Sequence, residues 1–149
     1  MRAVVQRVSR ARVTVDERVT GEITRGLLAY LGVGGGDGEA EAAYLAEKIA
    51  TLRVFEDERG RMSLDVVSAG GAVLVVPQFT LYGDVRKGRR PDFTAAMEPL
   101  RACELYERVV ALLRARGITV ATGEFRAHMM VDAVNDGPVT ILVDSARTF

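Results

Sequence analysis

The sequence lacks the residues on which several common kinds of site depend. It has 1 histidine, His128, and 1 cysteine, Cys103, which excludes an internal disulfide, a cysteine cluster and a two-histidine zinc site. The 20 Lys and Arg residues balance the 20 Asp and Glu residues, which excludes a globally basic coat for nucleic acid but allows a local basic patch. No apolar run approaches the roughly 18 residues of a membrane span, and the first residues lack the apolar core of a signal peptide. These absences predict a soluble, cytoplasmic protein that does not associate with membranes.

What the sequence does contain is typical of a folded domain. Its 149 residues are 48% hydrophobic and 27% charged, which is too apolar for disorder and suits a single domain spanning residues 1–149. Alternating and β-branched segments predict strands at 4–15, 19–23, 26–33, 53–56, 62–64, 72–76, 118–121, 129–134 and 139–144. The segment 26–33 is apolar almost throughout, so it is predicted to be buried on both faces.

Helical periodicity predicts two main helices. The first is expected to be capped by Asp37 and to bury Leu45, Ile49 and Leu52. The second covers 99–116, and a short helical piece precedes it at 92–97. The apolar stripe predicted for the second helix comprises Leu100, Cys103, Tyr106, Val110 and Leu113. Because strands and helices do not alternate strictly, the pattern predicts an α+β fold: a mostly antiparallel or mixed, barrel-like β-sheet with the two main helices packed on one face.

Two glycine-containing segments are predicted to be connections. The segment from Gly34 to Gly38 lacks both the Lys-Ser/Thr of a Walker A loop and the spacing of a dinucleotide fingerprint, so it is interpreted as a flexible loop. The segment Asn135-Asp136-Gly137-Pro138 is predicted to form a hairpin turn. Glycine allows a positive φ, and X-Pro is the bond for which the cis form is cheap, so this segment can also present an unusual backbone.

The side chains of the usual catalytic sets are missing, which makes backbone groups the candidates for chemistry. No Ser/His/Asp signature, no His-Glu-x-x-His and no Cys-x-x-Cys occurs. His128 is either a general base or an ordinary strand residue. Gln78, Phe79 and Thr80 follow a buried strand, where free N–H groups can bind an oxyanion or a substrate carbonyl. The alternative is a strand end in which Thr80 and Gln78 are simply hydrogen-bonded.

A cluster of basic residues follows this segment. It consists of Arg86, Lys87, Arg89 and Arg90, spaced by Gly88. Such a loop either follows a phosphate chain or is a solvated surface loop.

Several separated segments together resemble the D-aminoacyl-tRNA deacylase family. They are Pro77-Gln78-Phe79-Thr80-Leu81-Tyr82, the basic loop from Gly83 to Pro91, and Val134-Asn135-Asp136-Gly137-Pro138-Val139-Thr140, with the opening Met1 to Val8 and Gly26-Leu27-Leu28 matching as well. They occur in the family's order and extend from the first residue to the last strand, which makes the resemblance specific.

The resemblance implies a homodimer that hydrolyses the ester bond of D-aminoacyl-tRNA, and of glycyl-tRNA charged on the wrong tRNA, without a metal or cofactor. The tRNA is then the partner, and the basic loop is its expected binding segment. The catalytic motif corresponds to Gln78, Phe79 and Thr80. In the family the backbone around Phe79 and Thr80 holds the ester and the amino group of the substrate.

The resemblance also implies how the enzyme selects its substrate. Gly137 and Pro138 correspond to a pair with a cis peptide bond that reaches into the pocket of the partner subunit, where its carbonyl groups leave no room for an L side chain. Arg7 corresponds to an arginine that steadies this pair. Phe125 and Met129 correspond to residues that line the pocket.

Two positions depart from the family pattern. Pro77 stands where the family usually has serine, which removes a hydroxyl from the motif. Arg126 stands where the family often has glycine, at the mouth of the pocket, where a guanidinium can add a phosphate contact. Two alternatives remain open: Thr80 as a covalent nucleophile, and a dimeric RNA- or peptide-binding module without catalysis.

Overall fold

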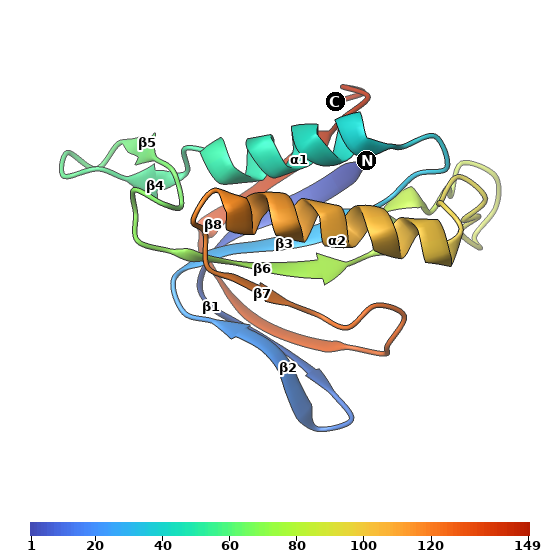
Figure 1. Cartoon of the computed structure of the whole chain (residues 1–149), viewed down its shortest axis with the longest axis horizontal. Helices are drawn as coiled ribbons and strands as arrows, with labels where there is room; N and C mark the ends of the chain where they lie inside the picture. Colours follow the sequence, from blue (N-terminus) through green and yellow to red (C-terminus); the bar gives the residue numbers. More distant parts are fainter.

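In a computed structural model, which describes residues 1–149, a strongly curved sheet carries two α-helices on one face (Figure 1). The elements in chain order are β1 (Arg2–Val15), β2 (Arg18–Ile23), β3 (Gly26–Gly32), α1 (Glu39–Thr51), β4 (Phe55–Glu56), β5 (Met62–Leu64), β6 (Ala72–Pro77), the 3₁₀ turn η1 (Phe79–Tyr82), α2 (Pro99–Ala115), β7 (Val120–Thr122) and β8 (Met130–Asp144). The predicted α+β fold, with a mixed, barrel-like sheet and both main helices on one face, is confirmed.

The long strand β1 organises the sheet because it is paired along both edges. One edge pairs antiparallel with β3 over residues 2–8 and with β2 over residues 11–15, while β8 runs antiparallel along the other edge. Parallel pairs β3–β6 and β6–β7 extend the sheet. A methyl group added at Gly21 of β2 would lie 2.3 Å from the carbonyl oxygen of Thr122 in β7, so the two ends of the curled sheet meet closely. The sheet is therefore nearly closed into a barrel.

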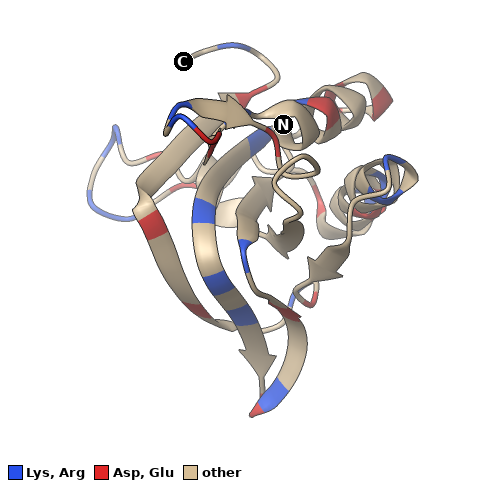
Figure 2. Ribbon diagram, turned by 90° about the vertical axis from the view of Figure 1, so that its left-hand side faces the viewer, with Lys and Arg blue, Asp and Glu red and all other residues tan.

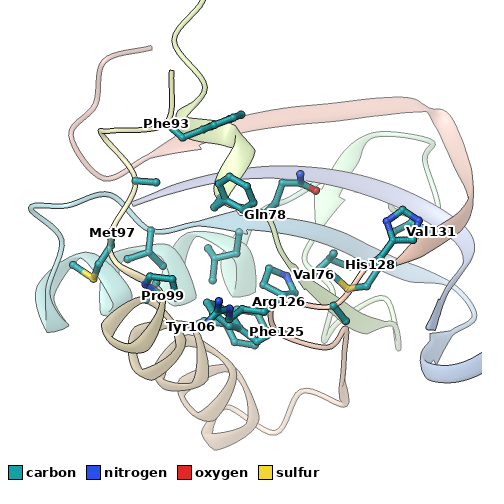
Figure 3. Close-up of a pocket in the computed structure, with 18 residues that line it drawn as sticks. Val76, Gln78, Phe93, Met97, Pro99, Tyr106, Phe125, Arg126, His128 and Val131 are labelled. Carbon is teal, nitrogen blue, oxygen red and sulfur yellow. The ribbon is translucent and has the colours of Figure 1, made fainter. Parts of the chain in front are cut away.

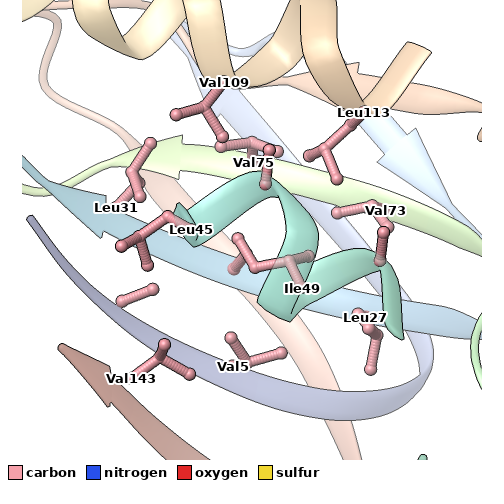
Figure 4. Packing of buried hydrophobic residues seen from close by; sticks show 14 of the residues in the cluster. Val5, Leu27, Leu31, Leu45, Ile49, Val73, Val75, Val109, Leu113 and Val143 are labelled. Atoms are coloured by element: carbon pink, nitrogen blue, oxygen red, sulfur yellow. The ribbon is translucent and has the colours of Figure 1, made fainter. Parts of the chain in front are cut away.

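Two hydrophobic clusters lie on opposite faces of the sheet. The larger packs the sheet against α1 and α2 and includes Val5, Leu27, Leu31, Leu45, Ile49, Val73, Val75, Val109, Leu113 and Val143 (Figure 4). The smaller lies within the curl of the sheet and consists of Val8, Ala11, Val13, Ile23, Leu28, Leu74 and Val76. Alternate residues of β3 and β6 enter the two clusters, so both strands are buried on both faces. The prediction of a doubly buried strand at 26–33 is confirmed.

The predicted hairpin turn at 135–138 is wrong, because this segment lies inside the single 15-residue strand β8. The pairing of β8 with β1 shifts register on both sides of Val8, opposite Asn135. There the side chain of Asn135 accepts the Val139 N–H at 2.9 Å and donates to the Val139 carbonyl at 3.2 Å. These bonds replace ladder bonds that the bulge removes, so the strand continues past glycine and proline.

The predicted cap of the first helix and the helical piece at 92–97 are also wrong. The helix α1 begins after Gly38, whose N–H donates to the Glu41 carboxylate at 2.8 Å. Asp37 instead accepts the Gly34 N–H at 2.6 Å and the Tyr82 hydroxyl at 3.2 Å. Residues 92–97 form only a turn between two isolated bridges.

The buried face of α2 differs in part from the predicted stripe. Tyr106, Val110 and Leu113 are buried as predicted, but the side chain of Leu100 is 76% exposed and Cys103 is half-buried. Ala102, Leu105 and Val109 complete the buried face. Both misplaced residues lie near the start of the helix, where it extends past the edge of the sheet (Figure 1).

Neither α1 nor α2 combines the length and the apolar character that a transmembrane helix requires.

Because β3 and β6 approach each other closely at Gly26, we expect a single added methyl group there to destabilise the protein. In Gly26→Ala, the new Cβ would lie 1.8 Å from the Ala72 carbonyl oxygen, so the two strands must separate. We expect a loss of at least about 2 kcal/mol of unfolding free energy, measured by urea denaturation. Gly36→Ala is the matched control, because no atom lies within 4 Å of its added Cβ. Equal denaturation midpoints for the two variants would contradict this close approach of β3 and β6.

Candidate active site

A pocket of ≈ 590 Å³ opens where β3 and β6 end, between the start of α2 and the loop that precedes β8 (Figure 3). Its lining is mostly apolar and comprises Leu31, Val33, Val76, Pro77, Gln78, Phe79, Phe93, Ala96, Met97, Pro99, Ala102, Tyr106, Phe125, Arg126, Ala127, His128, Met129 and Val131. A pocket of this size and composition suits a small organic ligand or the end of a larger one.

The rim of the pocket is formed by the turn that follows β6. The Gln78 N–H donates to the Leu31 carbonyl at 2.8 Å, after which the chain leaves the sheet and forms η1. The ring of Phe79 is 59% exposed and packs edge-on against Phe93, with 5.0 Å between ring centroids. The Gln78 side-chain amide donates to the hydroxyl of Thr80, which is exposed and does not line the pocket.

This turn supplies backbone donors at the rim. The first N–H groups of a 3₁₀ turn have no acceptor within the turn, because the bonds run from residue i+3 back to residue i. The N–H groups of Phe79 and Thr80 open η1 and are in this position. They are candidates for binding a carbonyl oxygen or an oxyanion.

The opposite wall of the pocket includes the aromatic rings of Tyr106 and Phe125. The Tyr106 hydroxyl donates to the Val75 carbonyl at 2.9 Å, and burial raises the pKa of this phenol well above its ordinary value, so Tyr106 stays neutral. The ring of Phe125 lies 6.0 Å from the Tyr106 ring. Gly123 lets the loop approach closely, since an added Cβ would lie 2.8 Å from the Met129 sulfur. Phe125 and Met129 therefore share one pocket with Gln78 and Phe79.

The pocket contains basic groups but no acidic ones. None of the lining residues is Asp or Glu, whereas Arg126 and His128 both line it. His128 lies in the loop before β8, exposed and without a hydrogen-bond partner, so its interpretation as a strand residue is wrong. No carboxylate or hydroxyl orients its ring as a general base.

A second cluster surrounds Arg7. This side chain is 7% exposed; its Nη1 donates to the Val54 carbonyl at 2.6 Å and its Nε to the Asp136 carbonyl at 3.1 Å. The neighbouring Gly137–Pro138 peptide bond is cis, in agreement with what the family resemblance implies, and both residues are exposed. A Cβ added at Gly137 would lie 3.3 Å from Arg7 Nη2. Arg7 thus holds the backbone that leads into Gly137 and Pro138.

The two clusters lie at opposite ends of β3. Arg7 pairs with Leu27 near the beginning of the strand, whereas Gln78 is bonded to Leu31 near its end. Neither Gly137 nor Pro138 lines the pocket of its own chain. The residues predicted to form one site are therefore divided between two places in a single chain.

Backbone hydrogen bonds close the base of the basic loop, and one of its four cations forms an ion pair. The N–H groups and carbonyls of Asp84 and Asp92 are reciprocally bonded, at 2.8 and 2.9 Å. The Arg86 guanidinium bonds the Asp84 carboxylate, with 2.9 Å between Nε and Oδ1, and lowers the pKa of Asp84 to about 2. The remaining cations, Lys87, Arg89 and Arg90, are exposed and form no ion pair. Residues of both signs also occur on the helices, strands and other loops, so positive charge is not confined to this loop (Figure 2).

Sequence reasoning missed the part of the pocket that comes from the start of α2 and the segment before it. Phe93, Met97, Ala102 and Tyr106 line the pocket, but none belongs to a segment whose pattern suggested a site. The only available signal was Phe93, an aromatic residue in a largely polar stretch.

A family model and curated relatives agree on one family. The model of the family described as D-Tyr-tRNA(Tyr) deacylase matches residues 4–144. A D-aminoacyl-tRNA deacylase of Koribacter versatilis is 65% identical over 149 residues, which cover 100% of both chains. A solved structure titled c-Myc DNA Unwinding Element Binding Protein matches with a TM-score of 0.92 and 42% identity, over 97% of this chain and 99% of that chain. A structure of a probable eukaryotic D-amino acid tRNA deacylase has the same fold, with a TM-score of 0.84 at 17% identity, over 95% and 97% of the two chains.

Proposed function

The chain belongs to the D-Tyr-tRNA(Tyr) deacylase family and is an ester hydrolase of D-aminoacyl-tRNA; we propose that its pocket binds the aminoacylated 3′ end and that backbone groups perform the chemistry. The observation that carries this proposal is the meeting of Gln78, Phe79, Phe125 and Met129 in one pocket, beside the unpaired start of η1. The family match favours this hydrolase over a binding module without catalysis.

The bond to be broken makes modest demands on the protein. An aminoacyl ester is already activated relative to an amide, so orientation and stabilisation of the oxyanion can suffice. One preorganised donor contributes roughly 2.7–4 kcal/mol, and orientation can contribute about 7–11 kcal/mol. The N–H groups of Phe79 and Thr80 are the proposed donors. The 2′-hydroxyl of the terminal ribose is proposed to help activate the attacking water.

The selection of D-aminoacyl groups is proposed to come from a second copy of the chain. Gly137 and Pro138 are exposed and lie away from the pocket of their own chain, so they can act on a substrate only in another copy. The strand β8 supports such an assembly, because it pairs only with β1 and leaves its other edge free. It also exposes apolar side chains, with Met130 66% and Leu142 56% exposed. We therefore propose a homodimer with two composite sites.

A backbone wall from the partner selects by exclusion. Its carbonyl groups are proposed to occupy the space of an L side chain, so a D side chain is admitted on the other side. Glycine has no side chain to exclude, which makes glycyl-tRNA a second substrate. Aminoacyl-tRNA is made and used in the cytoplasm, and the proposed reaction places the enzyme there.

Substitution of Thr80 separates backbone catalysis from a covalent nucleophile. We expect Thr80→Ala to hydrolyse D-Tyr-tRNA within about threefold of the wild-type rate, since the proposed donor is the Thr80 N–H group. A nucleophile model predicts a loss of at least about 10⁴-fold. Thr80→Ser, which keeps the hydroxyl, is the control. An inactive Thr80→Ala with an active Thr80→Ser would establish the nucleophile, and an unchanged ester half-life with wild-type protein would disprove deacylation altogether.

Substitution of Gly137 tests whether each site combines two chains. Gly137 has a φ of +134°, and an added Cβ would lie 2.9 Å from the Val139 nitrogen, so Gly137→Ala must displace the selector. We expect at least tenfold slower hydrolysis of D-Tyr-tRNA, which corresponds to an increase of about 1.4 kcal/mol or more in activation free energy, or new hydrolysis of L-Tyr-tRNA. Gln78→Arg should block the pocket of its own chain.

Mixed dimers of these two variants provide the decisive measurement. A dimer of Gly137→Ala with Gln78→Arg retains one site with an intact pocket and an intact selector, so activity should recover toward half of the wild-type rate. Each variant alone is the control. No recovery on mixing, with heterodimers confirmed by mass spectrometry, would contradict the composite site.

Salt dependence tests the basic loop. In one variant Gln replaces all four basic residues of the loop, Arg86, Lys87, Arg89 and Arg90. We expect the slope of log K against log salt for tRNA binding to become less steep by about 3 rather than 4, since each phosphate contact contributes about 1. Arg86 should add little because Asp84 already pairs with it. The control is a triple Gln variant of Arg108 and Arg114 on α2 and Arg116 directly after it. The same slope for both variants would mean that the loop is only a solvated surface.

A further inference from the structure

Arg126 has an unusual backbone conformation at the rim of the pocket. Its φ is +65°, in the left-handed region that favours glycine. Asp16 and Glu17 share this conformation in the turn between β1 and β2, and Arg147 shares it near the end of the chain. Of these residues only Arg126 lines the pocket. A long cationic side chain stands there on a backbone that a glycine would adopt more easily.

The guanidinium of Arg126 has no partner in its own chain. It forms no ion pair and no hydrogen bond, and no acidic residue lines the pocket. Glu124, the nearest acidic residue along the chain, is paired with Arg18 at 2.8 Å. The pocket therefore presents an uncompensated positive charge beside an apolar and aromatic surface. The ligand that complements it is an anionic group attached to an apolar or aromatic body.

The proposed substrate carries one anion at the corresponding place. The carboxyl group of the amino acid is esterified, so it has no charge, and the free amino group is a cation that Arg126 would repel. The anion next to the terminal nucleoside is its 5′-phosphate, which joins it to the preceding nucleotide. A guanidinium matches a phosphate with parallel charge-assisted hydrogen bonds.

We propose that Arg126 binds the phosphate on the 5′ side of the terminal nucleoside and thereby sets the depth at which the 3′ end enters the pocket. Figure 3 shows Arg126 beside Phe125 and Tyr106, across the pocket from Phe93. The nucleoside then lies against the aromatic lining while its phosphate faces the guanidinium at the rim. This inference rests on the proposed function, because it takes the aminoacylated 3′ end as the ligand.

Two unreactive ligands that differ only in this phosphate provide the test. Adenosine and adenosine 5′-monophosphate are titrated into the full-length protein, and their affinities are measured by calorimetry or NMR. We expect wild-type protein to bind the monophosphate about tenfold more tightly, the effect of one good charge-assisted contact. R126Q should bind both ligands equally, and R126K should keep part of the preference because it keeps the charge.

Arg126→Gly is a second test variant, and Arg147→Gly is its matched control. Both remove one exposed arginine from a left-handed position, but Arg147 lies against Tyr44 of α1 and does not line the pocket. R147G should keep the tenfold preference for the monophosphate, whereas R126G should lose it. The melting temperature of R126G should not fall, since glycine suits this backbone. A lower melting temperature would assign Arg126 a structural role and overturn the proposal.

The ligand titrations test the phosphate contact of Arg126, and hydrolysis of D-Tyr-tRNA tests the proposed function, so either one can be disproved without the other. Equal affinities of wild-type protein for the two ligands, or an unchanged preference in R126Q, would overturn the phosphate contact even if D-Tyr-tRNA is hydrolysed. A phosphate preference that depends on Arg126, in a protein that does not hydrolyse D-Tyr-tRNA, would support the contact and disprove the proposed function. With both intact, R126Q should raise KM for D-Tyr-tRNA about tenfold and leave kcat within about twofold.

Discussion

The hydrogen bonding of β1 along both of its edges is the constraint on which the rest of the structure depends. On one edge β1 holds β3, which in turn holds β6, and the register of β6 determines where η1 begins. On the other edge it holds β8, and the bulge opposite Val8 determines where Gly137 and Pro138 project. The pocket and the Gly137–Pro138 segment lie at opposite ends of one set of paired strands. The sheet therefore fixes the distance between them. A single chain cannot bring them together without breaking the sheet.

The chemistry available at the pocket follows from what the sheet leaves unpaired. Backbone N–H groups inside β3 and β6 are used by the ladder, and the first free ones occur where the chain turns out of the sheet at Phe79 and Thr80. A donor that is part of a tightly bonded turn needs no reorganisation when charge develops on a substrate, and the proposed hydrolysis without an acid–base pair relies on this property. The same rigidity in β8 is what a backbone selector requires.

The unpaired cations near the proposed site lie on loops, not on the strands and helices that form the core. The net charge is zero, and some exposed charges form pairs, such as Arg10 with Asp132 and Arg108 with Glu39. The unpaired cations that bear on the proposed reaction, Lys87, Arg89 and Arg90 in the loop and Arg126 at the rim, are on segments outside the sheet and the helices. A local excess of positive charge on such segments can attract an RNA end without burdening the core with unpaired charge.

The sequence by itself determined the fold class, the doubly buried strand at 26–33 and the motif residues, because apolar runs, alternation and short motifs are local properties. Phe125 and Met129 entered the prediction only through the family resemblance, and the structure places them with Gln78 and Phe79. Local patterns could not show that Asn135 uses its side chain to carry β8 through a segment that otherwise predicts a turn, since that depends on the partner strand. Nor could they show that Phe93 and Tyr106 complete the pocket, or that no acid neutralises Arg126. Tertiary structure decided these points, because burial, pairing and the balance of charge in a cavity arise from residues that are distant in the chain.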